Sequence, residues 1–176
     1  MSVEFVHEKL AIHTEYHPYF KSINQGILQD LSSFNFERDQ TMRGGRKSNV
    51  RGWKSRDEHH SKGVKLIDEW VVSCIKNTYW GMSIGLEWKS GIESWVVKCD
   101  KGDYTHEHDH IPAMFSFVYF IKCPKGSSPL VFTKSGKKIK AEEGKIVIFP
   151  GWLRHHVPKN KCEDRITMAG NIFYRQ

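Results

Sequence analysis

The sequence predicts a mainly β protein, a double-sheet jelly roll with supporting helices at its N-terminal end. Two observations predict this fold class. From residue 83 onward, short runs rich in Val, Ile, Phe, Tyr and Trp alternate with turn signals at regular spacing, as in all-β proteins built of two sheets. Before residue 83, apolar residues recur at three- and four-residue intervals, which is the period of an α-helix.

Two helices are expected in the N-terminal region. The first covers about residues 18–31 and the second about residues 64–77, and each carries one apolar stripe. The stripes consist of Phe20, Ile23, Ile27 and Leu31 in the first helix and of Val64, Ile67, Val71, Cys74 and Ile75 in the second. We expect a short strand at residues 3–6, and an irregular loop over the polar, glycine-containing segment 41–62.

Short strands follow the second helix. The runs that favour them are 83–89, 94–100, 115–122, 130–133, 137–140, 146–149, 154–157 and 165–174. Glycine, proline, serine and asparagine lie between these runs, and such residues are typical of turns. Strands of this number and spacing predict that segments far apart in the chain become neighbours in the two sheets.

The chain has 176 residues, of which 39% are hydrophobic and 12% aromatic, enough for the core of one domain. We predict a single domain over residues 1–176, with a helical and loop support region at 1–82 and a jelly-roll core at 83–176. No apolar run approaches the roughly 20 residues that span a bilayer, and the first residues do not resemble a signal peptide. We therefore expect a cytoplasmic protein without a membrane partner.

The chain is basic, with a formal net charge of +7. Its 27 Lys and Arg residues are spread along the chain without a dense block, so a solvated basic surface explains them at least as well as a nucleic-acid face. A nucleic-acid partner is possible but not favoured. The four cysteines are widely scattered, and this spacing favours reduced thiols over a zinc site.

Three histidines form the candidate functional site. His108 and His110 are separated by one residue, and side chains alternate along a strand, so both imidazoles are expected to point the same way from the start of one strand. His155, expected on another strand, would supply a third imidazole. Ten residues later, Arg165 could hold a carboxylate of an organic acid bound to the metal. Imidazole ligands suit iron, zinc, copper and nickel alike.

Other histidines near these positions offer alternatives. The pair His106 and His108 has the same spacing as His108 and His110, and His156 competes with His155 but should face the other side of its strand. Histidines are also common as ordinary surface residues, and an isolated pair would be weak support for a metal. The combination of three histidines with Arg165 favours the metal site.

The sequence resembles the Fe(II)- and 2-oxoglutarate-dependent oxygenases of the prolyl 4-hydroxylase-like group, in particular short oxygenases of phages and marine bacteria. The similarity runs through residues 95–104, HDHIPAMFSFVYF at 108–120, EGKIVIFPGWLRH at 143–155 and EDRITMAGN at 163–171. The upstream segment GGRKSNVRGWKS at 44–55 also resembles these relatives. The ordered combination covers roughly residues 43–174, and it implies the double-stranded β-helix, or cupin-like jelly roll, of that group.

The resemblance implies a role for each site residue. Fe(II) would be held by His108, His110 and His155, and 2-oxoglutarate would chelate it. The far carboxylate of 2-oxoglutarate would pair with Arg165 and accept a hydrogen bond from Thr167. Dioxygen would bind last, with succinate and carbon dioxide as co-products of substrate hydroxylation. Tyr119 is a further candidate for a hydrogen bond to the cosubstrate, although an aromatic residue in an apolar strand is often simply part of the core.

One position departs from the family pattern. Most such enzymes bind iron with two histidines and one carboxylate, whereas His110 stands at the carboxylate position. A neutral imidazole there leaves one more positive charge on the centre. Asp109 could replace His110 only if the strand is bulged at that point.

The sequence therefore predicts a dioxygenase that hydroxylates an unidentified substrate, with a peptidyl side chain or a small molecule favoured. Two further candidates for covering the site or contacting substrate are Trp152 and the segment that contains Arg46, Asn49, Trp53 and Lys54. The alternative is that these are ordinary surface residues. The alternative function is a cupin-like metal-binding protein without oxygenase activity, such as a sensor, an isomerase or a sugar-binding module. A degenerate jelly roll with a binding or structural role is a third reading. Arg165 and Thr167 favour the oxygenase, and the sequence leaves the oligomeric state open.

Overall fold

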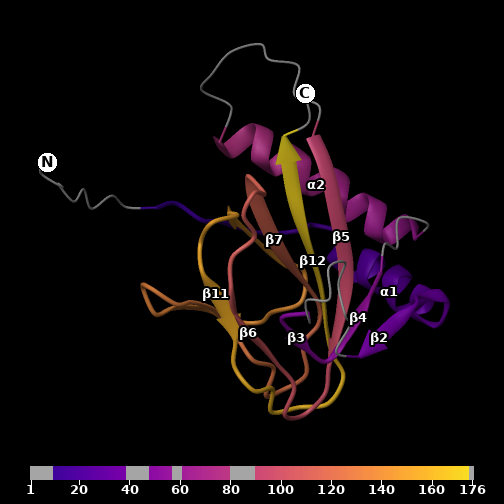
Figure 1. Ribbon diagram of the computed structural model, residues 1–176. Coiled ribbons are helices and arrows are strands. Elements are labelled where there is room, and N and C mark those ends of the chain that lie inside the picture. Colours follow the sequence, from indigo (N-terminus) through magenta and orange to yellow (C-terminus); the bar gives the residue numbers. More distant parts are fainter. Residues whose placement is uncertain (1–9, 39–47, 57–60, 80–89, 175–176) are drawn as a thin grey trace, which may run out of the picture.

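The computed structural model describes residues 10–38, 48–56, 61–79 and 90–174. These residues form two antiparallel sheets and two α-helices (Figure 1). The expected strands at 3–6 and 83–89 lie outside the described residues. No helix within the described ranges is long and apolar enough to cross a membrane.

The larger sheet has seven strands in the order β1-β10-β7-β12-β5-β4-β2. Their bounds are His13–Tyr16 for β1, Lys145–Pro150 for β10, Phe115–Lys122 for β7, Arg165–Tyr174 for β12, Ser90–Cys99 for β5, Trp53–Ser55 for β4 and Phe36–Arg38 for β2. The smaller sheet has the order β3-β6-β11-β8-β9. Its strands are Val50–Arg51 for β3, Tyr104–His108 for β6, His155–Val157 for β11, Leu130–Phe132 for β8 and Lys137–Ile139 for β9.

Both helices cover one face of the larger sheet, and the smaller sheet lies on its other side (Figure 1). Helix α1 spans Phe20–Asp30, followed by a 3₁₀ turn at Leu31–Ser33, and helix α2 spans Lys62–Tyr79. The two expected helices are thus confirmed. The mainly β architecture of two antiparallel sheets with N-terminal helices, predicted from the alternation of periods along the chain, is confirmed as well.

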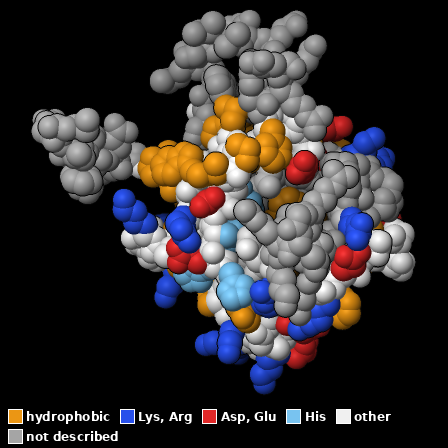
Figure 2. All heavy atoms as spheres, in the orientation of Figure 1, with side chains coloured by type: hydrophobic (Ala, Val, Ile, Leu, Met, Phe, Trp, Pro, Cys, Tyr) orange, Lys and Arg blue, Asp and Glu red, His pale blue; other side chains and the backbone are white. Residues whose placement is uncertain are grey.

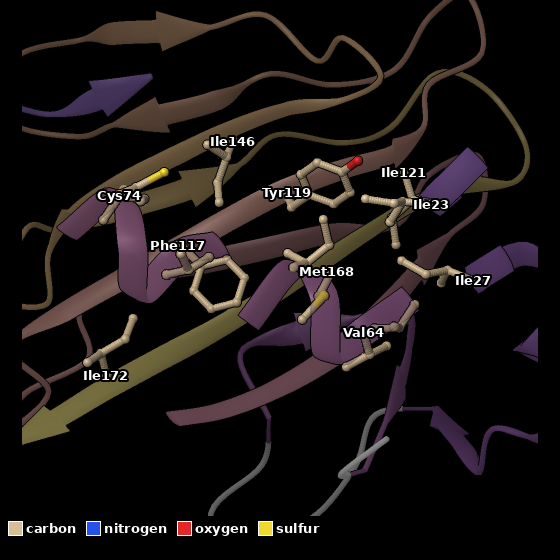
Figure 3. Close-up of a cluster of buried hydrophobic side chains, with 14 of the residues drawn as sticks. Ile23, Ile27, Val64, Cys74, Phe117, Tyr119, Ile121, Ile146, Met168 and Ile172 are labelled. Atoms are coloured by element: carbon tan, nitrogen blue, oxygen red, sulfur yellow. The ribbon is translucent and has the colours of Figure 1, made fainter. Parts of the chain in front are cut away.

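The helices pack on the sheet through a buried apolar cluster (Figure 3). Along β7, Phe117, Tyr119 and Ile121 all belong to this cluster, because alternate residues of a strand share one face. Asn24 of α1 joins the strand by donating from Nδ2 to the Ile121 carbonyl at 2.7 Å, and its Oδ1 accepts a 2.6 Å hydrogen bond from the Tyr119 hydroxyl. Tyr119 is therefore held in the core between the helices and the sheet.

A second cluster fills the space between the two sheets. It contains Phe120 of β7, Val147 and Phe149 of β10, and Leu130 and Phe132 of β8. Phe120 and Tyr119 are neighbours in sequence, yet they belong to different clusters. The larger sheet thus has an outer face toward the helices and an inner face toward the smaller sheet.

The N-terminal segments contribute strands to both sheets. β1 pairs with β10, β4 with β5, and β3 with β6. The expectation of an irregular loop over 41–62 was wrong for residues 50–51 and 53–55, which form β3 and β4. Their side chains lack a clear alternation in the sequence, and backbone pairing with strands far along the chain makes them extended.

The turn before β10 depends on its glycine. Gly144 has a φ of 81°, a conformation that costs little only for glycine. A Cβ atom there would also lie 2.3 Å from Cγ of Phe20 in α1. The glycine therefore allows α1 to pack directly against this turn.

The four cysteines, which the sequence analysis expected to be reduced, are all free thiols.

The hydrogen bond between Tyr119 and Asn24 predicts a measurable contribution to stability. Tyr119→Phe leaves the Asn24 Oδ1 buried without this partner, so we expect the free energy of unfolding to fall by about 1–3 kcal/mol in urea titrations. Tyr16→Phe is the matched control, because its hydroxyl bonds Glu142 at 2.6 Å from a side chain that is 50% exposed. Equal effects of the two substitutions would contradict this account of the core.

Candidate metal centre

The three histidines singled out in the sequence converge in the structure. Their ring centroids lie 4.7 Å apart for His108 and His110, 4.4 Å for His108 and His155, and 5.1 Å for His110 and His155. One ligand nitrogen from each ring can be chosen so that all lie within 4.8 Å of one another. Histidine side chains reach the surface on the face shown in Figure 2. The arrangement can hold a metal ion through three imidazole nitrogens.

Strand pairing places two of these histidines opposite each other. His108 is the last residue of β6 and His155 the first of β11, and they are direct partners in the antiparallel pairing of these strands. A shift of one residue would turn His156 toward His108 in place of His155. His156 instead lies 3.2 Å from the Thr133 hydroxyl through its Nδ1, away from the cluster.

His110 reaches the cluster in a different way from the one expected. It lies two residues beyond the end of β6, so the prediction that His108 and His110 begin one strand was wrong. Its N–H donates to the Gly151 carbonyl at 2.7 Å, and its carbonyl accepts from Ala113 N–H at 2.7 Å. A Cβ on Gly151 would lie 2.2 Å from the Ala113 carbonyl oxygen. The turn after β6 is therefore packed against the end of β10, which orients His110.

Backbone carbonyls fix the orientation of two imidazoles. His108 Nδ1 lies 2.7 Å from the His106 carbonyl, and His155 Nδ1 lies 2.8 Å from the Leu153 carbonyl. A carbonyl oxygen only accepts, so each Nδ1 carries the proton and each Nε2 has a free lone pair. This is the usual way in which proteins orient histidine ligands. Both rings are thus ready to bind a metal through Nε2.

Burial keeps the imidazoles neutral. It lowers the pKa of His155 to about 4 and holds the pKa of His108 below its ordinary value. The pKa of His110 is lowered by burial and, further, by the positive charge that His108, His155 and Lys54 would place beside it. Neutral imidazole is the form that binds metals. All three side chains are therefore in the ligating form at neutral pH.

The alternative ligands considered from the sequence lie outside this cluster. His106 is exposed and stacks edge-on against Tyr104, with ring centroids 4.9 Å apart. Asp109 accepts a hydrogen bond from Ile111 N–H at 3.3 Å. Neither residue joins His108 and His155 in the group of potential ligand atoms. The geometry therefore favours the three-histidine set over either replacement.

Arg165 is a buried cation on the inner face of the larger sheet. It is 2% exposed, and its Cζ lies 5.7 Å from the Phe120 ring centroid. Its Nε has no hydrogen-bond partner in the described structure, and no described carboxylate forms an ion pair with it. A buried charge without a counter-ion is costly. An anionic ligand bound beside Arg165 would supply the missing counter-ion.

The same interior space connects Arg165 with the histidines. Phe120, which Arg165 contacts, belongs to the inter-sheet cluster that includes Phe149. The Phe149 ring in turn lies 4.8 Å from the His155 ring. Thr167 follows two residues after Arg165 on β12, is 4% exposed, and pairs with Phe120 across the sheet. Arg165 and Thr167 thus lie on the face of the larger sheet that is turned toward the three histidines.

Tyr119 is not brought to this site. Its ring lies on the outer face, 6.3 Å from the Trp70 ring, and its hydroxyl is committed to Asn24. Burial raises the pKa of Tyr119 above the ordinary value. The sequence could not separate Tyr119 from Phe120, because both faces of this strand are buried and no polar alternation marks them. We therefore leave Tyr119 out of the site.

Lys54 lies near the candidate metal centre, although the sequence analysis placed it in an irregular loop. Its Nζ lies 4.0 Å from the centroid of the Trp95 ring, which itself lies 6.3 Å from the His110 ring. Burial lowers the pKa of Lys54 to about 8, and Glu93 partly opposes this shift. Among its companions, Trp53 is 37% exposed with Arg38 over its ring at 5.7 Å, and Asn49 accepts a backbone hydrogen bond from His106. Arg46 lies outside the described residues.

Two other features of the described structure lie away from the histidines. A groove of about 1130 Å³ runs between α1 and the turn after β7. His13, Glu15 and Cys74 form a second group of potential ligands. In that group Glu15 Oε2 lies 3.1 Å from His13 Nε2 and accepts from the Cys74 thiol at 3.5 Å. These hydrogen bonds are enough to explain why His13, Glu15 and Cys74 lie together.

Trp152, which the sequence offered as a candidate for covering the site or contacting substrate, is 49% exposed.

Comparison with known proteins supports this picture at the level of the fold. No family model and no curated protein matches the sequence. A prolyl-4-hydroxylase from Pseudomonas putida has a TM-score of 0.70 at 12% identity, over 95% of this chain and 94% of that one. A prolyl hydroxylase from Trichoplax adhaerens, solved with a hypoxia inducible factor peptide, has a TM-score of 0.67 at 15% identity, over 92% and 83%.

A third similar structure is HygX from Streptomyces hygroscopicus, solved with nickel, 2-oxoglutarate and hygromycin B. Its TM-score is 0.66 at 9% identity, over 93% of this chain and 83% of that one. The protein therefore has the double-stranded β-helix fold of prolyl 4-hydroxylases and 2-oxoglutarate- and Fe(II)-dependent oxygenases over nearly its whole length. This confirms the structural class implied by the sequence resemblance. The possible metal site of three histidines lies in this fold.

The convergence of the imidazoles predicts which substitutions remove metal binding. Alanine at His108, His110 or His155 is expected to abolish Fe(II) binding, because each change removes one of three ligands. His106→Ala and His156→Ala are matched controls that should retain most of it, since both side chains point elsewhere. Anaerobic titration with Fe(II), followed by metal analysis after desalting, measures the difference. Ordinary iron affinity in His155→Ala would refute the assignment.

The lowered imidazole pKa values predict a pH dependence of the metal-free protein. In the unfolded chain His155 takes up a proton near pH 6.5, but in the folded state it does so only near pH 4. The unfolded state binds more protons between these values, so the free energy of unfolding should fall as the pH is lowered from 7.5 to 5. Urea titrations should show a shallower decline in His155→Gln than in His156→Gln. Parallel declines in the two variants would contradict the prediction.

Proposed function

We propose that the protein is a dioxygenase dependent on Fe(II) and 2-oxoglutarate that hydroxylates a C–H bond of its substrate. The observation that carries the proposal is Arg165, a buried cation without a described counter-ion that faces the same inter-sheet space as three neutral imidazoles of the facing strands. Three imidazoles alone suit several metals. A cosubstrate that chelates the metal with one end and carries a carboxylate at the other explains why a buried arginine accompanies them.

The residues present fit both groups. Nε2 of His108 and His155 is free to bind iron because Nδ1 of each ring is bonded to a backbone carbonyl. His110 completes the set of ligands. Arg165 can form two parallel hydrogen bonds to the far carboxylate of 2-oxoglutarate, and the Thr167 hydroxyl lies on the same strand face to donate another. The histidines would therefore hold the iron to which one end of the 2-oxo acid binds, and Arg165 and Thr167 would hold its far carboxylate.

Each part of the site has a task in hydroxylation. Iron held by the three histidines would supply the redox chemistry by which 2-oxoglutarate and dioxygen give succinate, carbon dioxide and the hydroxylated product. His108, His110 and His155 would hold the metal ion at a fixed position. Arg165 and Thr167 orient the cosubstrate so that its far end does not move. The buried side chains Phe120, Val147 and Phe149 exclude water from this part of the site, which strengthens the pairing of Arg165 with the carboxylate.

The ligand set differs from the common pattern of two histidines and one carboxylate. His110 contributes no negative charge, and its pKa is lowered too far for a proton to compete at neutral pH. The centre therefore retains one more positive charge than a centre with a carboxylate ligand. We expect this charge to tighten the binding of anionic ligands and to reduce the preference for iron over other divalent metals.

This same ligand set is the specific observation behind a second candidate function. A cupin-like protein that binds zinc, nickel or manganese without oxygenase activity, such as a sensor, an isomerase or a sugar-binding module, would use three histidines equally well. It would give no reason for the buried guanidinium of Arg165. The oxygenase is favoured for that reason. A peptidyl side chain or a small molecule is favoured as its substrate, and a nucleic-acid partner is possible but not favoured.

The proposal predicts separate effects on metal and cosubstrate. Arg165→Ala should retain Fe(II) but lose 2-oxoglutarate binding by roughly a hundredfold or more, because the carboxylate loses its buried partner. Lysine at this position should restore only part of the affinity, since it supplies charge without the planar fork. Thr167→Ala should have a smaller effect, as expected for one hydroxyl hydrogen bond.

The assay is the change in visible absorbance when 2-oxoglutarate is added to the anaerobic Fe(II) protein, followed by succinate release on admitting oxygen. His156→Ala serves as the control with normal behaviour. A wild-type protein that binds Fe(II) but gives neither the absorbance change nor succinate would rule out the oxygenase. The metal-binding protein without oxygenase activity would then be the better account.

A further inference from the structure

We propose that Lys54 and Trp95 form a subsite beside the metal centre that receives a carboxylate of the substrate. This inference rests on the proposed function and narrows its substrate to a small carboxylic acid. The two residues lie on neighbouring strands, and Lys54 Nζ is 4.0 Å from the centroid of the Trp95 ring. The ring lies 6.3 Å from that of His110. The ammonium group is thus held beside the candidate metal site, next to His110.

Strand register turns Lys54 toward the interior. Lys54 pairs with Val97 of β5, and Val97 pairs with Thr167 of β12. Directly paired residues of adjacent strands lie on the same face of a sheet. Lys54 therefore shares the inner face with Thr167 and, two residues along β12, with Arg165. Its flanking residue Ser55 lies on the other face, where its hydroxyl accepts from Val96 N–H at 2.9 Å.

The charge of Lys54 is unpaired in the described structure. No described carboxylate lies within ion-pair distance of its Nζ, and Glu93, the acidic group that acts on it, is exposed. Other cations of these strands have partners: Arg38 pairs with Asp103, and Lys98 and Lys122 pair with Asp164. Lys54 and Arg165 thus share two properties, a place on the inner face and no described counter-ion.

The balance of charge on the inner face favours an anionic substrate. Three neutral imidazoles leave the full charge of a divalent metal in place, and Arg165 and Lys54 add one positive charge each. The dianion 2-oxoglutarate offsets the equivalent of two of these charges, and Glu93, which alternates onto the same face of β5 as Trp95, offsets part of the charge of Lys54. The remaining positive charge, in a partly desolvated site, favours a further anion more strongly than it would in water.

The geometry of the ammonium group favours a carboxylate as that anion. An ammonium over the face of an indole is attracted by the ring, and it has three N–H donors, of which the ring can engage only those that point toward it. The remaining donors point away from Trp95 and can reach one carboxylate. Proteins generally bind a phosphate with several donors, whereas one ammonium matches one carboxylate. The indole face also offers apolar contact to the rest of a small substrate.

Binding of simple probes tests the subsite without knowledge of the substrate. The protein is loaded with Co(II) and saturated with N-oxalylglycine, so that Arg165 is already occupied. Benzoate is then titrated, and the relaxation of its ring protons by Co(II) reports binding near the metal. Benzamide, which has the same shape without the charge, is the matched probe. We expect benzoate to bind at least tenfold more tightly than benzamide to the unaltered protein.

Variants assign this difference to Lys54. Lys54→Gln should lower benzoate affinity at least tenfold and leave benzamide unchanged, whereas Lys54→Arg should keep most of the benzoate affinity. Lys98→Gln is the control, because it removes one positive charge from the adjacent strand on the opposite face. Equal binding of benzoate and benzamide, or equal benzoate affinity in Lys54→Gln and Lys98→Gln, would overturn the subsite.

The same experiment separates the two levels of the argument. A change in the Co(II) absorption spectrum on adding N-oxalylglycine supports the proposed function, and an absent benzoate effect after that change counts against the subsite alone. If the Co(II) protein does not respond to N-oxalylglycine, the proposed function fails and the subsite fails with it.

Discussion

The pairing of β6 with β11 is the constraint on which the rest of the site depends. It sets His155 opposite His108, and backbone carbonyls two residues before each histidine then orient the two rings. β11 also pairs with β8, which ties His155 into the smaller sheet through Phe132. Because side chains alternate along a strand, a slip of one residue would exchange His155 for His156 and dismantle the cluster. The register of two short strands thus decides whether a metal site exists.

The same alternation of side chains places the core and the candidate site residues on opposite faces of the larger sheet. Its outer face carries Tyr119 and Met168 into the core beneath the helices, and its inner face carries Phe120, Thr167 and Arg165. The helices therefore bury one side of every central strand without contacting the site. The inner face, covered by the smaller sheet, carries the candidate site, and jelly rolls that hold small molecules use this side of their sheets.

The electrostatic character of the site follows from its desolvated cations, which have no described counter-ions. Three imidazoles are neutral at physiological pH, Arg165 is buried without a described counter-ion, and Lys54 is desolvated over Trp95. Such a face destabilises the unliganded protein, because buried cations are costly without anions. In the function proposed above, binding of a metal chelate and a carboxylate would remove that cost. On this proposal, the charge that weakens the folded state would also select its ligands.

The sequence by itself determined the helices α1 and α2, the strands β7 and β12, and the spacing of the three histidines and Arg165, because these depend on local periodicity and on short motifs. The sequence also predicted the strands β5, β8, β9, β10 and β11 to within a few residues at each end. Tertiary structure alone decided the other positions. Thr105, for example, lies in a strand that carries no apolar alternation, and it becomes extended by pairing with Val50 and Val157. The position of His110 beyond the strand depends on contacts with Gly151, and the inward turn of Lys54 depends on its register with Val97. Pairing partners far along the chain set these positions, and a local pattern contains no information about them.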